Sequence, residues 1–341
     1  MKLVSWNIEW MNNWFVGGHK VEMRTQQISR GKILIENVPA LAQRITNVLK
    51  TLDADVVTIQ EGPSDFREMQ LYVDLFLNDD QGNPIYDVLG GLGKGAQKVY
   101  AFVKKSGQFK NATLVKDELT LELEEEWLAD IDGDLVLEEY GYTRPPLVIE
   151  GEFKGDKIRI ISLHTKSKFV YSQRSLWENE NRRMEFIQAA MKNRRRISAE
   201  GFRLRKYLND VMTDNPTKKV IVTGDWNDGP GNDYFERNYL THNITDIILG
   251  STFYPKLLFR HALLDKVPHD ELYTAIFDDF IDDIDNRKIL LDHIVASPAL
   301  ANGIINGGVC HQEYENAINH QATTDREKFP SDHRPVFIEL L

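Results

Sequence analysis

Polar residues that can bind a metal ion or move a proton stand at the ends of several apolar, strand-like segments. The stretch VTGDWNDGP (222–230) follows the apolar run KKVIV and carries Asp225, Asn227 and Asp228. A chain that only had to turn would need no more than glycine and proline. Because loops gather where strands end in α/β folds, we expect a site built from such residues. They are Asn7, Glu61, His164, Asp225, Asn227, Asp292, His293, Asp332 and His333.

The oxygen ligands in this set suit a hard divalent cation. Mg²⁺ prefers oxygen ligands, keeps several waters and is usually held by one or two carboxylates. Glu61 and the amide oxygen of Asn7 fit this sparse shell, and Asp332 can add a carboxylate directly or through water. Asn7 has a structural alternative, because it can simply end a strand. We expect Mg²⁺ as the cofactor, with Mn²⁺ as an alternative and Ca²⁺ as a poorer match.

His333 has the chemistry of a general base, because an unperturbed imidazole titrates near neutral pH and can take a proton from water. Asp225 and Asn227 are two residues apart, so on an extended strand tip both side chains point to the same side. An Asx-turn is the structural alternative for this pair. Next to Asp292, the side chain of His293 points to the opposite face of its strand, and we interpret it as structural.

These residues require strands and helices that position them. Residues 2–8 alternate as a strand does, and 36–52 has a helical stripe with Asn37 as its cap and Pro39 in the first turn. Further strands are predicted at 54–62, 85–89, 98–104, 111–115, 146–153, 157–164, in KKVIVTGDWND, at 288–297 and at 334–340. Helices are predicted at 64–77 and 173–212. Strands lying among helices indicate a sheet with helices on both faces.

The composition is that of an ordinary globular protein, with 341 residues, 42% hydrophobic and 27% charged. The net charge of −11 argues against a protein that coats nucleic acid by bulk attraction. Cys310 is the one cysteine, which excludes an internal disulfide. With no apolar run long enough to cross a membrane, we expect a cytoplasmic protein. We predict a single domain over 1–341, with inserted loops near 116–144, 165–200 and 250–287.

The quoted motifs, taken in order, resemble those of the endonuclease/exonuclease/phosphatase superfamily, which includes exonuclease III, deoxyribonuclease I and neutral sphingomyelinases. The matching stretches are WNIE, IQE, LHTKS, GDWND, LDHIVAS and SDHRPV, and they extend from residue 6 to residue 336. The resemblance implies a four-layer α/β sandwich, in which two packed mixed sheets are flanked by helices as in deoxyribonuclease I. It also implies metal-dependent hydrolysis of a phosphoester.

The resemblance further implies roles for individual residues. Asp292 would orient His333 by binding its other ring nitrogen. Asp225 and Asn227 would align the nucleophile, contact the phosphate or serve a second metal. His164 is similar to the second histidine of the deoxyribonuclease I and sphingomyelinase branches, whereas exonuclease III-like members have tyrosine there. The stretch LHTKS therefore favours a branch other than abasic-site repair.

Basic residues near these strand ends are candidate contacts for the substrate phosphate, namely Arg144, Lys166 and Lys168. The segment 181–206 concentrates arginine on one helix. Ion pairing across an acidic protein is the favoured explanation for this helix, and a track for a phosphate backbone is the alternative. Two loops resemble binding motifs only loosely. GGLGKGAQ (90–97) is predicted to be a turn, and DIDGDLVLEE (130–139) a solvated acidic loop.

We therefore expect a divalent-metal-dependent phosphoester hydrolase, foremost a phosphodiesterase or nuclease that uses water activated by His333. A phosphomonoesterase or lipid phosphodiesterase on the same scaffold is the alternative, and a non-catalytic binding protein is a third. DNA, RNA, small phosphoesters and lipids all stay open as substrates. The acidic charge slightly favours a small substrate, and no clear apolar hairpin supports a lipid. The sequence does not indicate an oligomeric state or the number of metal ions.

Overall fold

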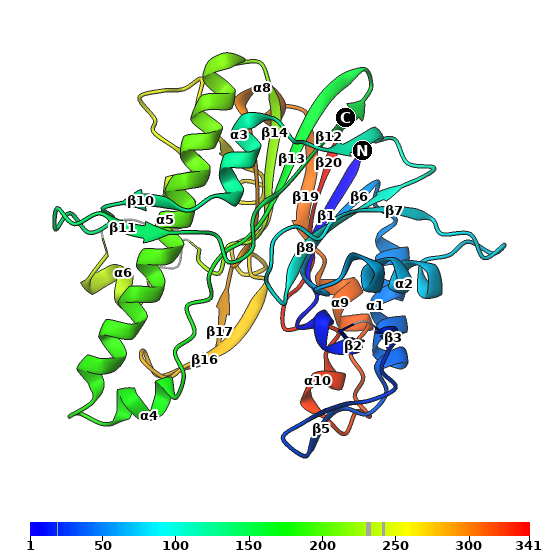
Figure 1. The fold of residues 1–341 in the computed structure, drawn as a ribbon, viewed down its shortest axis with the longest axis horizontal. Coiled ribbons are helices and arrows are strands. Elements are labelled where there is room, and N and C mark those ends of the chain that lie inside the picture. Colours follow the sequence, from blue (N-terminus) through cyan, green and yellow to red (C-terminus); the bar gives the residue numbers. More distant parts are fainter. Residues whose placement is uncertain (19, 230–232, 241–242) are drawn as a thin grey trace.

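Two six-stranded mixed sheets pack face to face at the centre of the molecule (Figure 1). The computed structural model describes residues 1–18, 20–229, 233–240 and 243–341. The first sheet has the order β19 (Ile304–Val309), β20 (Val336–Leu340), β1 (Lys2–Asn7), β6 (Val56–Gly62), β8 (Lys98–Lys104) and β7 (Tyr86–Gly90). The second has the order β15 (Arg260–His261), β18 (Asp292–Ala296), β14 (Lys219–Asp225), β13 (Asp156–His164), β12 (Leu147–Phe153) and β9 (Lys110–Leu114).

Helices cover the outer face of each sheet. Helices α1 (Val38–Leu52) and α2 (Phe66–Phe76) lie on the first sheet, and the long helix α5 (Arg183–Asp214) lies on the second (Figure 1). This arrangement confirms the predicted four-layer α/β sandwich. Within the described ranges, no helix has the combination of length and apolarity that a membrane span requires.

Short elements connect these layers. Near the N-terminus they are η1 (Met11–Trp14), β2 (Phe15–Gly17), β3 (Lys20–Met23), β4 (Gln27–Ser29) and β5 (Lys32–Ile35). The middle of the chain adds α3 (Glu118–Leu121), η2 (Glu122–Glu124), β10 (Trp127–Ala129), β11 (Glu138–Tyr140), α4 (Gln173–Glu178), α6 (Tyr234–Asn238) and α7 (Ile244–Leu249). The last part adds β16 (Ala275–Asp279), β17 (Ile284–Ile289), α8 (Pro298–Ala301), α9 (His311–Asn316) and α10 (Asp325–Lys328).

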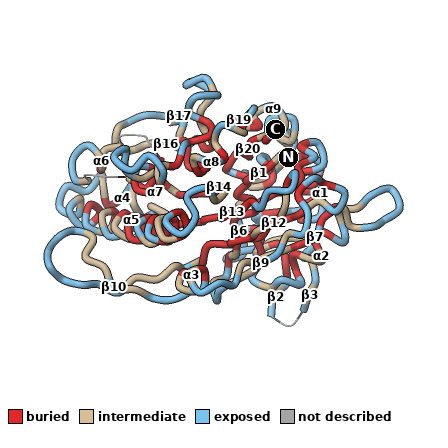
Figure 2. The backbone as a smooth tube through the Cα atoms, turned by 90° about the horizontal axis from the view of Figure 1, so that it is seen from above, coloured by how far each residue is buried: buried red, intermediate tan, exposed pale blue. Residues whose placement is uncertain are grey.

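The alternation of side chains along each strand distributes the buried residues among three layers of core. In β1, Leu3 belongs to the core between the two sheets, whereas Val4 belongs to the core under α1 and α2. In β13, Ile160 lies between the sheets and Ile161 packs under α5. Buried residues accordingly run through the middle of the molecule when it is seen from above (Figure 2).

Towards one end, the layer between the sheets changes from hydrocarbon to polar side chains. Leu3, Ser5 and Asn7 share the inward face of β1 because they are two residues apart. Across the layer, Gln60 Nε2 donates to Ser162 Oγ at 2.9 Å. Burying a polar group costs free energy unless the group is hydrogen-bonded, and this bond satisfies both side chains. The more strongly polar residues at the strand ends lie next to this pair.

Most of the predicted elements are present, with two breaks. The predicted helix 173–212 is interrupted between α4 and α5, where Asn179 Oδ1 accepts a hydrogen bond from the Asn181 amide at 3.1 Å. The predicted strand 288–297 divides into β17 and β18. There the backbone amides of Leu291 and Asp292 both donate to Thr274 Oγ1, at 3.0 and 3.1 Å, instead of continuing the ladder. Strand β19 is absent from the sequence prediction.

The insertions predicted near 165–200 and 250–287 contribute to a small core outside the sandwich. Val170, Leu176 and Phe186 are buried there against Phe235 of α6. Phe280, between β16 and β17, packs against the same group. This satellite core gives the inserted segments an apolar anchor of their own.

Gly224, next to the last residue of β14, adopts a backbone conformation that other residues rarely adopt. Its φ is +128°, and a Cβ at this position would lie 2.0 Å from the carbonyl oxygen of Leu163 on the neighbouring strand. Gly224→Ala should therefore lower the free energy of unfolding by roughly 3 kcal/mol and displace Asp225, as denaturant unfolding would measure. Gly307→Ala is the matched strand control, because its nearest atom is at 3.3 Å and its φ is ordinary. Equal effects of the two changes would contradict this account.

Candidate active site

Three of the predicted site residues stand side by side at the end of the second sheet. His164 is the register partner of Asp225 between β13 and β14, and Asp225 is the partner of Asp292 between β14 and β18. Directly opposite residues in a sheet point to the same face. All three side chains are buried, and together they form a row that faces the first sheet.

The first sheet brings Asn7 and Glu61 to this row. Asn7 Nδ2 donates to Asp225 Oδ2 at 2.9 Å and to Glu61 Oε1 at 3.3 Å. His164 Nε2 lies 3.5 Å from Asp225 Oδ2 and 3.9 Å from Glu61 Oε1. Residues from opposite sheets and from positions more than 200 apart in sequence therefore share one polar cluster.

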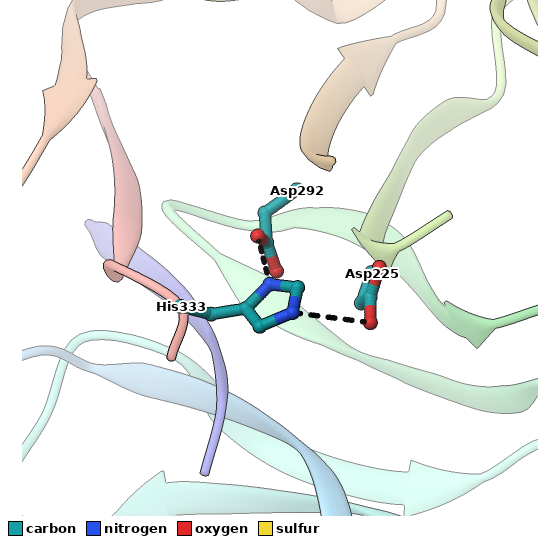
Figure 3. Close-up of side chains that lie close together, drawn as sticks. All are labelled: Asp225, Asp292 and His333. Atoms are coloured by element: carbon teal, nitrogen blue, oxygen red, sulfur yellow. Dashed lines mark hydrogen bonds and ion pairs between the residues drawn. The ribbon is translucent and has the colours of Figure 1, made fainter. Parts of the chain in front are cut away.

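His333 completes the cluster from the loop before β20. Its Nδ1 is 2.7 Å from Asp292 Oδ2, and its Nε2 is 3.9 Å from Asp225 Oδ2 (Figure 3). Two hydrogen bonds hold the backbone of His333 in place. Trp6 Nε1 donates to the His333 carbonyl at 2.8 Å, and the His333 amide donates to Ser331 Oγ at 3.1 Å. The ring is thus held between two carboxylates with little freedom to rotate.

Burial and close packing of acids shift the pKa values in this cluster. Burial lowers the pKa of His333, but the carboxylates of Asp292, Asp225 and Asp332 outweigh it and raise the pKa well above its ordinary value. The unperturbed value used in the sequence argument therefore does not apply. Burial raises the pKa of Asp225 to about 7 and also raises the pKa of Glu61. Ionised carboxylates are unfavourable where water cannot reach them, and a bound divalent cation would stabilise their charge.

The residues predicted as metal ligands lie along one edge of the cluster. Glu61 is in the cluster itself, and Asp332 is at its exposed rim, with a side chain 44% exposed and Oδ1 4.0 Å from His333 Nε2. Asn7 turns its Nδ2 to the carboxylates, while its Oδ1 accepts from the Glu9 amide at 3.0 Å. Amide oxygen and nitrogen are distinguished by hydrogen-bonding partners, and rotation of the amide would exchange them.

A second grouping of potential ligands consists of Asp225, Asp292 and His333, whose ligand atoms lie within 4.8 Å of one another. Asp292 Oδ2 is already bound to His333 Nδ1, as an orienting acceptor would be. In this contact Asp292 Oδ2 and His333 Nδ1 occupy each other and are not free to bind a metal. Glu61, with Asn7, has the donor set of a hard cation.

Glu9 belongs to this edge, although the sequence argument did not single it out. Its Oε2 accepts from the Asp332 amide at 3.0 Å, and Arg326 Nε lies 3.3 Å from the same oxygen. Burial raises the pKa of Glu9 to about 7. The quoted motif WNIE contains Glu9, but strand alternation does not orient it, because β1 ends at Asn7 and Glu9 has a left-handed φ of 46°.

Asn227 reaches the site by a route different from the predicted one. Strand β14 ends at Asp225, and Asn227 has a left-handed φ of 50°, so strand alternation does not orient it. Instead, Asp225 Oδ1 accepts from the Asn227 amide at 2.8 Å, which is the Asx-turn considered as the alternative. The turn leaves Asp225 Oδ2 facing the cluster, with Asn227 Nδ2 at 3.3 Å from it. Structural and site roles therefore coincide here.

The three predicted phosphate contacts have different surroundings. Arg144 is largely buried and donates to the carbonyls of His164 and Thr165, at 3.3 and 2.7 Å. The backbone amide of Lys166 donates to Glu200 Oε2 at 2.9 Å, and among the described residues its side-chain ammonium has no carboxylate within ion-pairing distance. Lys168 is paired with Asp228 and with Asp233, the latter at 3.5 Å, and we no longer assign it to the substrate.

The arginines of segment 181–206 are mostly paired with acids, in agreement with the favoured explanation for this segment. The ion pairs are Arg182 with Glu185, Arg194 with Asp233, Arg195 with Asp132, Arg196 with Glu200, and Arg203 with Glu122. Arg195 reaches the loop 130–139 in this way. A helix whose positive charges are paired offers little attraction to a phosphate backbone.

Behind the site, a pair of buried histidines ties the strand ends together. His293 Nε2 lies 2.8 Å from the Asp228 carbonyl, and His293 Nδ1 lies 3.0 Å from His261 Nε2. The carbonyl requires a proton on Nε2, so His293 Nδ1 must accept from His261. The indole of Trp226 stacks on the His293 ring, with centroids 4.5 Å apart. Both rings are therefore neutral, and His293 has the structural role predicted for it.

Neutral buried histidines predict a loss of stability in acid. Burial lowers the pKa of His293 to about 4 and also lowers that of His261, whereas an unfolded histidine titrates near 6.5. The unfolded chain thus binds more protons below pH 6.5, and the free energy of unfolding should fall by roughly 3 kcal/mol between pH 6.5 and 4 from His293. Denaturant unfolding of His293→Gln should show a shallower decline. An unchanged slope would argue against this origin.

Comparisons with known proteins were made on both sequence and structure. The model of the Endonuclease/Exonuclease/phosphatase family matches residues 4–333. Comparison with curated protein sequences gives no match. Among solved structures, truncated TDP2 of Caenorhabditis elegans is 14% identical with a TM-score of 0.50, over 99% of this chain and 95% of that one.

Two structures from Bacteroides thetaiotaomicron are similar to the same extent. One is an endonuclease/exonuclease/phosphatase family protein, with 14% identity, a TM-score of 0.51, and coverage of 100% of this chain and 97% of that one. The other is the mannosyl-6-phosphatase Bt3783, with 14% identity, a TM-score of 0.49, and coverage of 100% and 99%. At this identity the C. elegans TDP2 structure and the family protein from B. thetaiotaomicron show the fold alone. The family match, which spans nearly the whole sequence, shows that the chain belongs to the endonuclease/exonuclease/phosphatase family.

Proposed function

We propose that this protein is a divalent-metal-dependent phosphodiesterase that cleaves its substrate with water activated by His333. The observation that carries the proposal is the 2.7 Å contact between His333 Nδ1 and Asp292, which directs Nε2 towards Asp225 and the polar cluster. A histidine oriented in this way by a buried carboxylate is the arrangement required of a general base. The family to which the chain belongs is hydrolytic, which supports the reaction class.

Asn7, Glu61 and Asp332 would hold the cation, which we propose to be Mg²⁺, with Mn²⁺ as an alternative. Their oxygens fit a hard ion, and the buried carboxylate of Glu61 has a raised pKa that a cation would reverse. Glu9 lies close enough to Asp332 to contribute through water. When bound, such an ion would polarise a phosphoryl oxygen, offset the developing negative charge and weaken the carboxylate field around His333.

The remaining residues would orient the reactants. Asp292 keeps a proton on His333 Nδ1, so that Nε2 accepts the proton of the attacking water. Asp225 and Asn227, joined by their turn, would align that water. The new bond forms between the water oxygen and phosphorus. The bond from phosphorus to the leaving oxygen breaks, and the leaving oxygen keeps the electron pair and takes a proton from solvent water. Burial and the nearby Arg144 lower the pKa of His164, so a neutral His164 would donate a hydrogen bond to the phosphate.

A second candidate is hydrolysis of a small phosphomonoester on the same residues. The ion-paired arginines of α5 and the net charge of −11 favour it, because both reduce attraction for a long polyanion. Arg144 and Lys166 would then contact the single phosphate. Cleavage of a diester and of a monoester requires the same nucleophile, so the cluster itself supports both candidates.

A substrate panel tests the proposal. Purified protein would be incubated with bis(p-nitrophenyl) phosphate, p-nitrophenyl phosphate, single- and double-stranded DNA, RNA and sphingomyelin vesicles. Each would be assayed with Mg²⁺, Mn²⁺ or Ca²⁺ and with a chelator. Hydrolysis of diesters that the chelator abolishes is the expected result, and a clear preference for the monoester would favour the second candidate. No hydrolysis of any phosphoester with any of the cations would overturn both.

A further inference from the structure

Gln97 links the carboxylate of Glu61 to the guanidinium of Arg144. Gln97 Nε2 donates to Glu61 Oε2 at 2.6 Å, and Gln97 Oε1 accepts from Arg144 Nη1 at 2.9 Å. The residue is only 8% exposed, and it immediately precedes β8. The sequence predicts a turn without a function for its segment, 90–97. The structure instead puts the last residue of this segment against a proposed metal ligand.

The chemistry of the two neighbours determines how the Gln97 amide is oriented. A guanidinium only donates hydrogen bonds, and an ionised carboxylate only accepts them. A side chain between Arg144 and Glu61 must therefore accept on one end and donate on the other. A primary amide does both without carrying a charge. A carboxylate at this position would face Glu61 with no proton to donate, and an ammonium would face Arg144 with no acceptor.

The same contacts connect the two sheets. Glu61 belongs to β6 of the first sheet, whereas Arg144 also donates to the carbonyls of His164 and Thr165 at the end of β13 in the second. The line from Glu61 through Gln97 and Arg144 to β13 is thus a brace across the site. Burial lowers the pKa of Arg144, while the carboxylates of Glu61, Glu200 and Asp225 oppose that effect. The positive charge of Arg144 therefore interacts favourably with the acids of the site.

The remaining contacts of Glu61 leave its orientation dependent on this brace. Oε2 accepts from the Trp10 amide at 2.7 Å as well as from Gln97, while Oε1 has the longer contact with Asn7 Nδ2 at 3.3 Å. Two donors therefore hold Oε2, and Oε1 is directed towards Asn7 and His164. Among the described residues, Gln97 is the only side chain that donates to Oε2, so loss of this contact would allow the carboxylate to rotate.

We propose that Gln97 is a positioning residue, which acts through Glu61 to set the affinity of the site for a divalent cation. The inference rests on the proposed function, because it assumes that Glu61 binds that cation. Residues that orient metal ligands typically contribute a factor of about 10 to 100 in affinity. Arg144, in turn, would act as the fixed end of the brace as well as a candidate phosphate contact.

Calorimetric titration with Mn²⁺ tests the inference without relying on turnover. Gln97→Met keeps the length of the side chain and removes both hydrogen bonds, so the Kd for Mn²⁺ should rise about 10- to 100-fold. Gln97→Asn keeps the amide but is too short to reach both neighbours, and it should weaken binding in the same direction. Gln70→Met is the matched control, since the half-buried Gln70 donates to Asp74 Oδ1 at 2.8 Å on α2, away from the site.

The outcomes separate this inference from the proposed function. If the wild-type protein binds no Mn²⁺, or binds it equally well after Glu61→Gln, the proposed function fails. If the wild-type site binds Mn²⁺ through Glu61 and both Gln97 variants bind within twofold of it, only the role of Gln97 is overturned. Thermal unfolding without metal accompanies each titration. Should Gln97→Met not fold, the Gln97→Asn titration decides, and an unchanged Kd there overturns the inference.

Discussion

Replacement of His333 by alanine should lower kcat by about 10³-fold on whichever phosphoester the protein hydrolyses. The reason is the loss of the only imidazole that Asp292 orients among the described residues, at 2.7 Å, and positioned general bases contribute factors of about 10² to 10⁴. Affinity for Mn²⁺ should change much less, because His333 is assigned to proton transfer and not to the metal. Steady-state kinetics and calorimetry measure the two effects separately.

Two further variants make the His333 result specific. Asp292→Asn keeps the shape of the orienting residue but removes its charge, and it should lower kcat in the same direction while the fold persists. His320→Ala changes an exposed histidine and should leave kcat within about twofold, as surface substitutions do. Full activity in His333→Ala would refute the assignment of the base, even if the protein is a phosphoesterase.

Glu61→Gln should raise the Kd for Mn²⁺ by more than about 100-fold, and activity at limiting metal should fall with it. The substitution is isosteric, so it removes charge from the proposed metal site with little change in packing. Burial raises the pKa of Glu61, which means that its ionised form is unfavourable in the metal-free protein. The melting temperature without metal should therefore stay the same or rise, whereas the increase in melting temperature on adding Mn²⁺ should disappear.

If Glu61 is a metal ligand, Glu61→Gln leaves the metal-free melting temperature unchanged or higher but removes the stabilisation by Mn²⁺. If Glu61 is only a structural acid, the substitution lowers the metal-free melting temperature instead. Glu118→Gln alters an exposed glutamate near the start of α3 and should change neither quantity. A large loss of metal-free stability in Glu61→Gln, with Mn²⁺ binding unaffected, would assign Glu61 to the framework. In that case Asp225, Asp292 and His333 would be the next candidate ligands near the site.

The parts of the site that the sequence predicted are those governed by strands. Asn7, His164 and Asp225 end their strands and Asp292 begins β18. Strand pairing brings His164, Asp225 and Asp292 into register in the second sheet. The alternation in residues 2–8 correctly put Leu3 and Asn7 on one face. Fold class followed from the ordered motifs and from strands lying among helices, and the two sheets with their covering helices agree with it.

The parts that could not be predicted depend on contacts made by loops. Nothing in the segment 90–97 indicates that Gln97 reaches Glu61, because both the length of the turn and the position of Arg144 decide that contact. The break before β18 depends on Thr274, whose hydroxyl accepts two amide protons from a segment distant in sequence. The pKa of His333 likewise depends on Asp292 and Asp225, which come from distant segments, and not only on its sequence neighbour Asp332.

The position of β20 between β1 and β19 has a consequence for how activity appears during folding. Trp6, near the start of the chain, holds the carbonyl of His333, which lies 327 residues later. A contact of such long range closes a very large loop and forms slowly compared with local structure. Refolding followed by turnover should therefore lag behind refolding followed by circular dichroism, and the onset of hydrolysis would report that the last strand has been inserted.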